Sequence, residues 1–119
     1  MPTVFQTLST ADQLDRALAE SSRRPLVIFK HSPTCGISAQ ALESISEWMT
    51  VETRDADFFI LPVQAGRAVS TLLAQRFGIR HESPQVMVID RGEVAWHGSH
   101  FRATADAIAA ALDRLVAAT

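Results

Sequence analysis

Hydrophobic residues follow two periods along this chain, one typical of amphipathic helices and one typical of strands. Thr10 and Gln13 have the spacing of a capping box and predict the start of a first helix. The buried face of that helix is predicted to consist of Leu14, Ala17 and Leu18. The apolar run at residues 26–29 predicts a buried strand, and residues 3–7 fit a short strand before the first helix.

Three further helices are predicted from apolar residues at helical spacing. The first runs from Cys35 to about Met49 and has an inner face of Ile37, Ala41, Ile45 and Trp48. The second is ended by Gly78 and has a predicted face of Val69, Leu72, Leu73 and Phe77. The third lies near the C-terminus and has a predicted face of Ile108, Leu112, Leu115 and Val116.

The remaining apolar runs predict three more strands. Residues 58–63 form one, and residues 86–89 and 94–97 flank a turn at residues 90–93 and so predict a hairpin. The resulting order of helices and strands is thioredoxin-like. We therefore expect an α/β fold, a mixed β-sheet flanked by helices, in one domain of residues 1–119. Strands joined through a helix should be parallel, and the hairpin antiparallel.

Composition removes several classes of function. Eleven basic and thirteen acidic residues give a net charge of −2, which leaves no electrostatic footprint for nucleic acid or an anionic membrane. The apolar runs are too short to span a bilayer, and the N-terminus lacks the pattern of a signal peptide. A single cysteine cannot form an internal disulfide, as is typical of a reducing compartment. We expect a soluble, cytoplasmic protein.

The single cysteine, Cys35, lies where the strand at residues 26–29 gives way to a helix. A lone cysteine is by default a small buried hydrophobic residue. A helix N-terminus, however, presents unpaired N–H groups and a positive dipole end, which favour the thiolate. We therefore expect Cys35 to be reactive.

Two polar residues near Cys35 allow two interpretations each. His31 adds to the positive field around the thiol if it is protonated, or is simply exposed to solvent. Ser38 stands where a Cys-x-x-Cys protein has its second cysteine. Its hydroxyl either donates a hydrogen bond to the thiolate or satisfies backbone groups of the first helical turn. In both cases any disulfide of Cys35 must be intermolecular.

A proline precedes the strand at residues 86–89. Pro84 alone would only mark a strand boundary, and most bonds before proline are trans. In the thioredoxin-like order, a proline here is the cis-proline that faces the active-site cysteine. We therefore expect a cis Ser83–Pro84 bond, with the Ser83 backbone turned toward an extended substrate.

Three segments resemble the monothiol bacilliredoxin family of the bacillithiol redox system. They are FKHSPTCGIS (residues 29–38), HESPQV (residues 81–86) and GEVAWHGSH (residues 92–100). The resemblance implies a thioredoxin-like protein whose cysteine removes bacillithiol from S-bacillithiolated proteins, with bacillithiol as co-substrate and no bound cofactor. It implies Cys35 and Ser38 as catalytic residues. The substrate-binding residues would be His31, Thr34, Ser83, Pro84, Ser99 and His100.

One residue departs from that pattern. Gly36 stands where the family commonly has proline, and makes the motif Cys-Gly-Ile-Ser, close to the Cys-Gly-Phe-Ser of monothiol glutaredoxins that carry iron–sulfur clusters. Those proteins hold glutathione with a Gly-Gly and an acidic residue after the hairpin, which residues 96–101 here do not match. A cluster carrier is thus one alternative, and a binding adaptor with an inert cysteine is another.

Basic residues near the thiol are candidates to orient the malate dicarboxylate of bacillithiol. They are Lys30, Arg80, His81, His100 and Arg102, each expected to be an ordinary surface residue otherwise. The histidines at positions 31, 81, 97 and 100 invite a metal site with Cys35. Because no pair has the i, i+4 spacing of helical ligands, we expect no metal.

Overall fold

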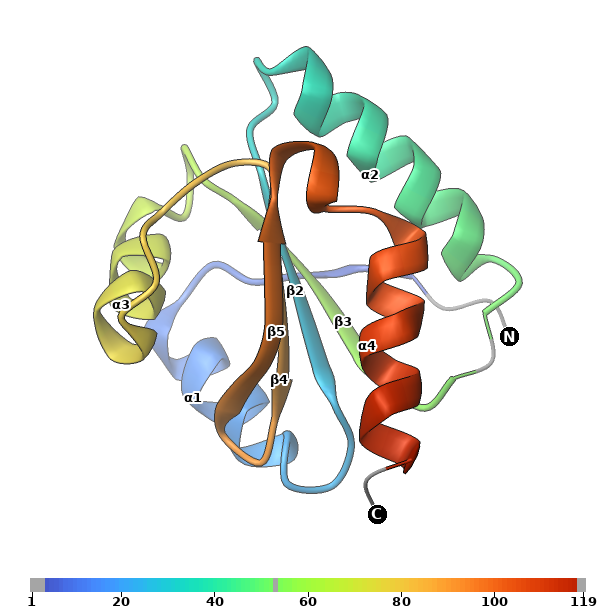
Figure 1. The fold of residues 1–119 in the computed structure, drawn as a ribbon. Coiled ribbons are helices and arrows are strands. Elements are labelled where there is room, and N and C mark those ends of the chain that lie inside the picture. Colours follow the sequence, from blue (N-terminus) through green and yellow to red (C-terminus); the bar gives the residue numbers. More distant parts are fainter. Residues whose placement is uncertain (1–3, 53, 118–119) are drawn as a thin grey trace.

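The computed structural model describes residues 4–52 and 54–117. It contains a five-stranded sheet with helices on both faces (Figure 1). The strands are β1 (Gln6–Thr7), β2 (Leu26–His31), β3 (Asp57–Pro62), β4 (Gln85–Asp90) and β5 (Glu93–Ser99). The helices are α1 (Ala11–Glu20), α2 (Gly36–Met49), α3 (Arg67–Phe77), the short 3₁₀ helix η1 (His100–Arg102) and α4 (Ala105–Ala117).

The strand order is β1-β3-β2-β4-β5. Strands β2 and β3 are parallel, because the connection between them runs through α2, whereas β4 is antiparallel to both β2 and β5. The predicted α/β class and mixed sheet are confirmed. The early strand is Gln6–Thr7, shorter than expected, and residue 3 lies outside the described residues.

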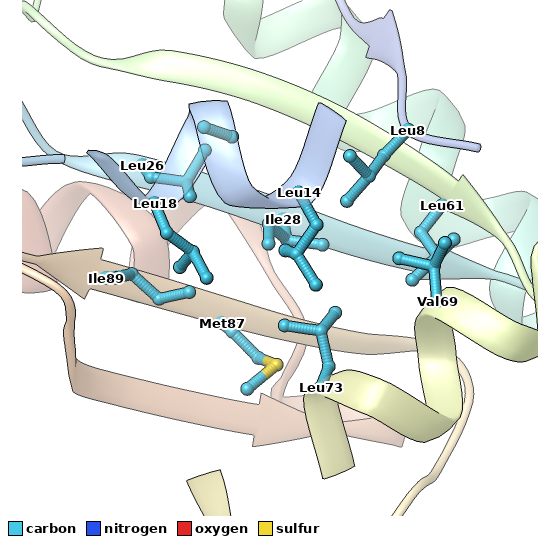
Figure 2. Close-up of a cluster of buried hydrophobic side chains, with 11 residues drawn as sticks. Leu8, Leu14, Leu18, Leu26, Ile28, Leu61, Val69, Leu73, Met87 and Ile89 are labelled. Atoms are coloured by element: carbon cyan, nitrogen blue, oxygen red, sulfur yellow. The ribbon is translucent and has the colours of Figure 1, made fainter. Parts of the chain in front are cut away.

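The side chains of the central strands divide between two cores. In β2, Leu26 and Ile28 face α1 and α3, whereas Val27 and Phe29 face α2 and α4. Figure 2 shows the first of these cores, in which leucines of α1 and α3 cover the sheet. Because both faces of β2 are covered, every residue from Leu26 to Lys30 is buried.

The hairpin between β4 and β5 turns at two residues. Arg91 and Gly92 both have positive φ, 53° and 78°, as a tight two-residue hairpin turn requires. The expected turn at residues 90–93 is therefore shorter, because Asp90 and Glu93 already pair. The turn is held against α1, since the Arg91 N–H donates to Ser21 O and the Gly92 N–H donates to Ser21 Oγ, both at 2.9 Å.

The helix ends largely follow the sequence pattern. The capping box of Thr10 and Gln13 is confirmed, and Gly78 ends α3 in the left-handed conformation. Two predicted core positions are wrong: Leu72 is 42% exposed and Val116 is 72% exposed. Leu72 directly precedes Leu73, and Val116 directly follows Leu115. Successive helical residues are rotated by about 100°, so two neighbours cannot both point to the centre of the buried face.

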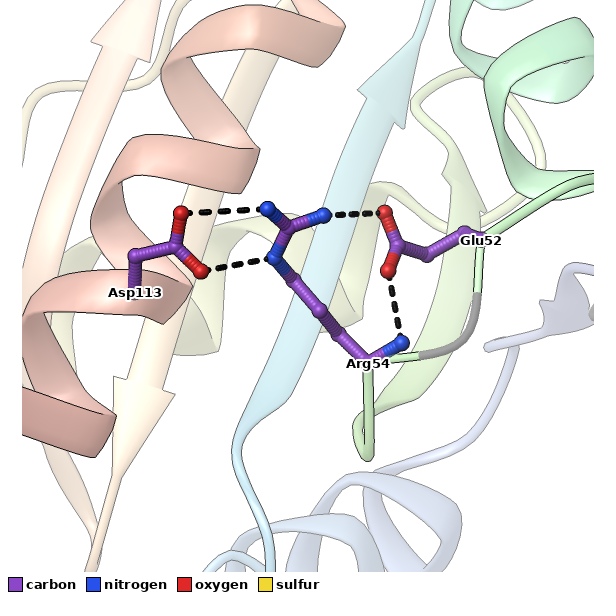
Figure 3. Close-up of polar contacts among 3 residues, drawn as sticks. All are labelled: Glu52, Arg54 and Asp113. Atoms are coloured by element: carbon purple, nitrogen blue, oxygen red, sulfur yellow. Dashed lines mark hydrogen bonds and ion pairs between the residues drawn. The ribbon is translucent and has the colours of Figure 1, made fainter.

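An ion-pair cluster joins the segment before β3 to α4 (Figure 3). The Arg54 guanidinium donates to both carboxylate oxygens of Asp113, at 2.8 and 3.0 Å, and to Glu52 Oε2 at 2.7 Å. The hydrogen bonds to Asp113 and Glu52 raise the pKa of Arg54, and the Arg54 guanidinium lowers the pKa of Asp113. This cluster links α4 to the segment before β3 at the surface.

Among the described residues, no helix is long and apolar enough to cross a membrane.

Candidate functional site

Cys35 is the N-cap of α2, directly after the loop that follows β2. Its backbone is extended, at φ −104° and ψ 120°, and its carbonyl accepts the N–H of Ala39 at 3.0 Å. The helix itself begins at Gly36, one residue later than expected. The half-buried side chain therefore belongs to the residue that begins α2, although within the described residues its thiol makes no capping hydrogen bond to the first turn.

The side chain of Ser38 is fully buried one turn into α2. Its Oγ accepts the Ser32 N–H at 3.0 Å and lies 2.7 Å from Nδ1 of His31. Neither partner belongs to the first turn of α2, so the hydroxyl satisfies groups of the loop and of β2 and not the backbone of the helix. These contacts hold the loop that carries Cys35 against the end of β2.

His31 lies on the α2 side of the sheet, where its ring stacks on Phe29 with centroids 5.9 Å apart. Burial lowers the pKa of His31, so the imidazole is neutral at pH 7. It therefore adds no positive charge near the thiol, and it is not simply exposed to solvent. A neutral ring allows Nδ1 to accept the Ser38 hydroxyl proton.

The predicted substrate-binding loop meets this end of β2 from the next strand. The Ser83–Pro84 bond is cis, as expected. Because Phe29 pairs with Val86 and Lys30 with Gln85, continuing the same register places Pro84 opposite His31. The fold thus brings the half-buried Ser83 and the buried Pro84 to the end of β2 that leads into the Cys35 loop.

Ser99 and His100 lie on the other side of Pro84. The His100 N–H donates to Pro84 O at 2.8 Å, and His100 has a positive φ of 55°, a conformation that costs energy in a residue other than glycine. His100 Nε2 lies 3.8 Å from Glu82 Oε2, and a hydrogen bond from Ser99 is the main cause of a lowered pKa for Glu82. These contacts join the Pro84 loop to η1.

Thr34 is exposed in the loop before Cys35, with Oγ1 3.4 Å from Ser32 Oγ. Figure 1 shows this loop and η1 at the same end of the molecule. The structure therefore places the predicted site residues in two groups at one end, one around Ser38 and one around Pro84. Their catalytic and binding roles stay predictions.

Lys30 is 1% exposed, so the expectation that it is an ordinary surface residue is wrong. It is the only lysine of the chain. It lies on the α3 side of β2, where Nζ is 3.2 Å from Nδ1 of His81, and Ser70 Oγ lies 3.0 Å from the same nitrogen. Burial lowers the pKa of Lys30 to about 8.

Sequence reasoning missed two polar residues near Lys30. Ser70 occupies the buried face of α3, and Gln85 is buried opposite Lys30, with its Oε1 unpartnered among the described residues. Gln85 Nε2 donates to Arg80 O at 3.1 Å and to Ser99 Oγ at 3.2 Å. The signal was present, because a polar residue inside an apolar pattern marks a buried polar contact.

The other candidate basic and metal-binding residues are dispersed. Arg80 and Arg102 are exposed. Within residues 4–52 and 54–117, no group of three or more His, Cys, Asp or Glu side chains could hold a metal ion. Gly36 leaves open space on its Cβ side, since an added Cβ would meet no atom within 4 Å.

The site contains one thiol, at the start of a helix and near a proline loop. A thiol so placed can attack a disulfide sulfur and form a mixed disulfide. The residue one turn later is a serine, which cannot displace that mixed disulfide. The arrangement therefore supports thiol–disulfide exchange with an external second thiol.

Comparison with known proteins agrees with this chemistry. The family model described as "Monothiol bacilliredoxin BrxC" matches residues 6–108. A solved structure, described as that of a proposed oxidoreductase with a thioredoxin fold, is 32% identical, with a TM-score of 0.81 over 91% of this chain and 93% of that one.

More distant structures share the fold alone. A thioredoxin from Malassezia sympodialis is 19% identical, with a TM-score of 0.74 over 96% of this chain and 93% of its own. Thioredoxin from Trypanosoma brucei brucei is 9% identical, with a TM-score of 0.79 over 98% and 95%. With its lone cysteine at the start of α2 and a family match over most of its length, this chain belongs to the monothiol bacilliredoxin family and is a thioredoxin-fold thiol oxidoreductase.

Proposed function

We propose that this protein removes bacillithiol from S-bacillithiolated proteins through Cys35. One observation carries the proposal: Cys35 is the N-cap residue of α2, and the residue one turn later is a buried serine. A bacillithiol bound to Cys35 has no second thiol in the chain that could displace it. The cycle must therefore use an external small thiol as co-substrate.

The reaction consists of two exchanges. In the first, the Cys35 thiolate attacks the bacillithiol sulfur of a protein mixed disulfide. The Cys35–bacillithiol bond forms, the protein–bacillithiol bond breaks, and the protein thiolate leaves with the electron pair and takes a proton from water. In the second, the thiolate of a free bacillithiol attacks the sulfur of the bound one. Bacillithiol disulfide forms and the Cys35 thiolate is released.

The two residue groups at the site have separate tasks in this cycle. The hydrogen bonds among His31, Ser32 and Ser38 hold the Cys35 loop in place. The loop at Ser83 and Pro84, joined to His100, provides the surface along which the substrate protein lies. Thr34, exposed beside the thiol, and Ser99 complete that surface.

The proposal is tested with one peptide carried as two mixed disulfides, one with bacillithiol and one with glutathione. After acid quenching, intact-mass spectrometry should show bacillithiol transferred to Cys35, then lost when free bacillithiol is added. Cys35→Ser should show no transfer. Transfer of glutathione in preference to bacillithiol would contradict the proposal, as would an adduct that free bacillithiol cannot remove.

A further inference from the structure

A cavity of about 390 Å³ lies along α3, on the side of the sheet away from α2. Val63, Arg67, Ser70 and His81 line part of its wall. The Val63 N–H donates to His31 O at 2.9 Å. This lining residue is therefore hydrogen-bonded to the last residue of β2, which precedes the Cys35 loop. His81 begins the segment that ends at Pro84. The cavity therefore lies on the α3 side of the Pro84 loop, and none of its described lining residues belongs to the Cys35 loop.

Among the described residues, the lining of this cavity carries a positive charge and no negative one, although Glu82, which lies outside the lining, acts on His81. None of the described residues that line it is acidic. Arg67 and Lys30 have no ion pair among the described residues; Arg24 and Arg54 have two each and Arg76 has one, whereas exposed arginines such as Arg102 also have none. Gln85 Oε1 on the Lys30 side provides only a partial negative charge. A buried ammonium without a carboxylate is costly, and its retention favours a role with an anion.

His81 connects the buried charge to the cavity. An ammonium only donates hydrogen bonds, so Nδ1 of His81, at 3.2 Å from Lys30 Nζ, must be the acceptor. The ring hydrogen is then on Nε2. Partial desolvation and then the charge of Lys30 lower the pKa of the otherwise exposed His81, against a smaller opposing effect of Glu82. With Nδ1 turned inward on Lys30 and Ser70, the Nε2–H is left as a donor toward the cavity that His81 lines.

The opposite side of the Pro84 loop differs. His100, near Arg102, already faces a carboxylate, because its Nε2 lies 3.8 Å from Glu82. An incoming anion there would meet a negative charge. Glu82 also acts on His81, but as the smallest of three causes and without an ion pair among the described residues, so the basic groups beside α3 are the better anion site.

We propose that Arg67 and the Nε2–H of His81, supported by Lys30, bind a carboxylate of the small thiol that Cys35 carries or receives. The site would make this protein prefer thiols that bear carboxylates, such as the malate group of bacillithiol. This inference rests on the proposed function for the identity of the thiol. The pocket itself can be tested without turnover.

The kinetic test compares one uncharged peptide carried as mixed disulfides with bacillithiol and with 2-mercaptoethanol, which has no carboxylate. The ratio of the two second-order rate constants should fall roughly fivefold in Arg67→Gln and in Lys30→Met, the size of a partly exposed charge contact. Arg114→Gln, an exposed arginine of α4, removes the same charge and should keep the ratio. An unchanged ratio in both cavity variants, or a fall only in Arg102→Gln, would overturn the site.

A second arm distinguishes the source of the carboxylate. The same assay is repeated with a peptide that carries glutamates beside its cysteine. If the site takes the carboxylate of the small thiol, the effect of Arg67→Gln should follow the thiol and not the peptide. An effect that appears only with the acidic peptide would show that the protein substrate supplies the anion and would overturn the assignment to the small thiol.

A binding test separates this inference from the proposed function. L-malate should shift the NMR signals of the His81 ring, identified by their loss in His81→Gln, whereas malamide, its neutral diamide, should not. Lys30→Met should weaken the malate response. A wild-type protein that binds malate but does not transfer bacillithiol would refute the proposed function and keep the site. Absence of any malate shift would refute the site.

Discussion

Lys30 and His31 are neighbours at the end of β2, but they serve opposite sides of the sheet. The Lys30 ammonium is buried toward α3 and contacts His81, whereas the His31 ring lies toward α2 and contacts Ser38. One residue carries an uncompensated charge and the other is neutral at pH 7. Because a strand alternates its side chains, two consecutive polar residues support two different halves of one site.

The comparison suggests a division of tasks. The His31 side positions the thiol, since its hydrogen bonds hold the loop from Ser32 to Cys35. The Lys30 side does not touch that loop directly and has donors in excess. Changes on the His31 side should therefore alter the thiol chemistry and the stability of the loop. Changes on the Lys30 side should alter the buried positive charge beside α3.

The largest effect is expected from Ser38→Cys. A second thiol one turn after Cys35 creates a dithiol, in which the new cysteine should displace a small thiol from Cys35 without a second molecule. Intact-mass spectrometry of the bacillithiol adduct should show its spontaneous loss, together with an internal disulfide. An adduct as long-lived as that of the wild type would show that residues 35 and 38 are not apposed.

Lys30→Met should stabilise the protein at neutral pH. The drop of the Lys30 pKa from 10.5 to about 8 corresponds to a cost of roughly 3 kcal/mol in the folded state. Loss of the hydrogen bond to His81 offsets about 1 kcal/mol of this gain in stability. The free energy of unfolding at pH 7 should therefore rise by about 2 kcal/mol, measured by urea denaturation in a Cys35→Ser background.

The pH dependence gives the sign of this effect independently. Below pH 8 Lys30 is protonated in both states, so the full cost is present. Between about pH 8 and 10.5 the unfolded state holds more protons, so wild-type stability should rise with pH, and the rise should be absent in Lys30→Met. Because Lys30 is the only lysine, its side-chain NMR signal reports this pKa directly. A midpoint near 10.5 would contradict the burial argument.

Ser38→Ala should destabilise the His31 side by about 1–2 kcal/mol. The change leaves the Ser32 N–H and His31 Nδ1 without their shared partner at the Cys35 loop. Urea denaturation should show the loss, and the exchange rate should fall because the loop is less fixed. Ser44→Ala, an exposed serine in the same helix, is the matched control and should change stability by less than about 0.5 kcal/mol. Equal effects of the two changes would show that the Ser38 hydrogen bonds do not hold the Cys35 loop in place.

Gly36→Pro should have the smallest effect, a stabilisation of about 1 kcal/mol. Gly36 is the first residue of α2, where proline is favoured, and the extended backbone of Cys35 suits a residue before proline. Gly36→Ala has the same open space and should stabilise less. Thermal unfolding would check the order of the three proteins, and a lower Tm for the proline variant would count against this description of the helix start.

Much of the fold was predictable because local patterns carried it. The capping box at Thr10, the end of α3 at Gly78 and the α/β order all follow from spacing and local backbone preference. The errors at Leu72 and Val116 arose where one stripe of leucine and valine was wider than the buried face. Periodicity shows which side of a helix is apolar, but neighbouring elements decide how much of it is covered.

The site divides in the same way. The sequence by itself determined that one cysteine would start a helix after a buried strand and that a proline would precede β4. These are local features of residue type and order. Only the tertiary structure decided that Lys30 is buried against His81, that the ring of His31 is neutral, and that Ser38 contacts the loop. Those properties depend on which side of β2 each residue faces and on groups brought close by strand pairing, which no local pattern specifies.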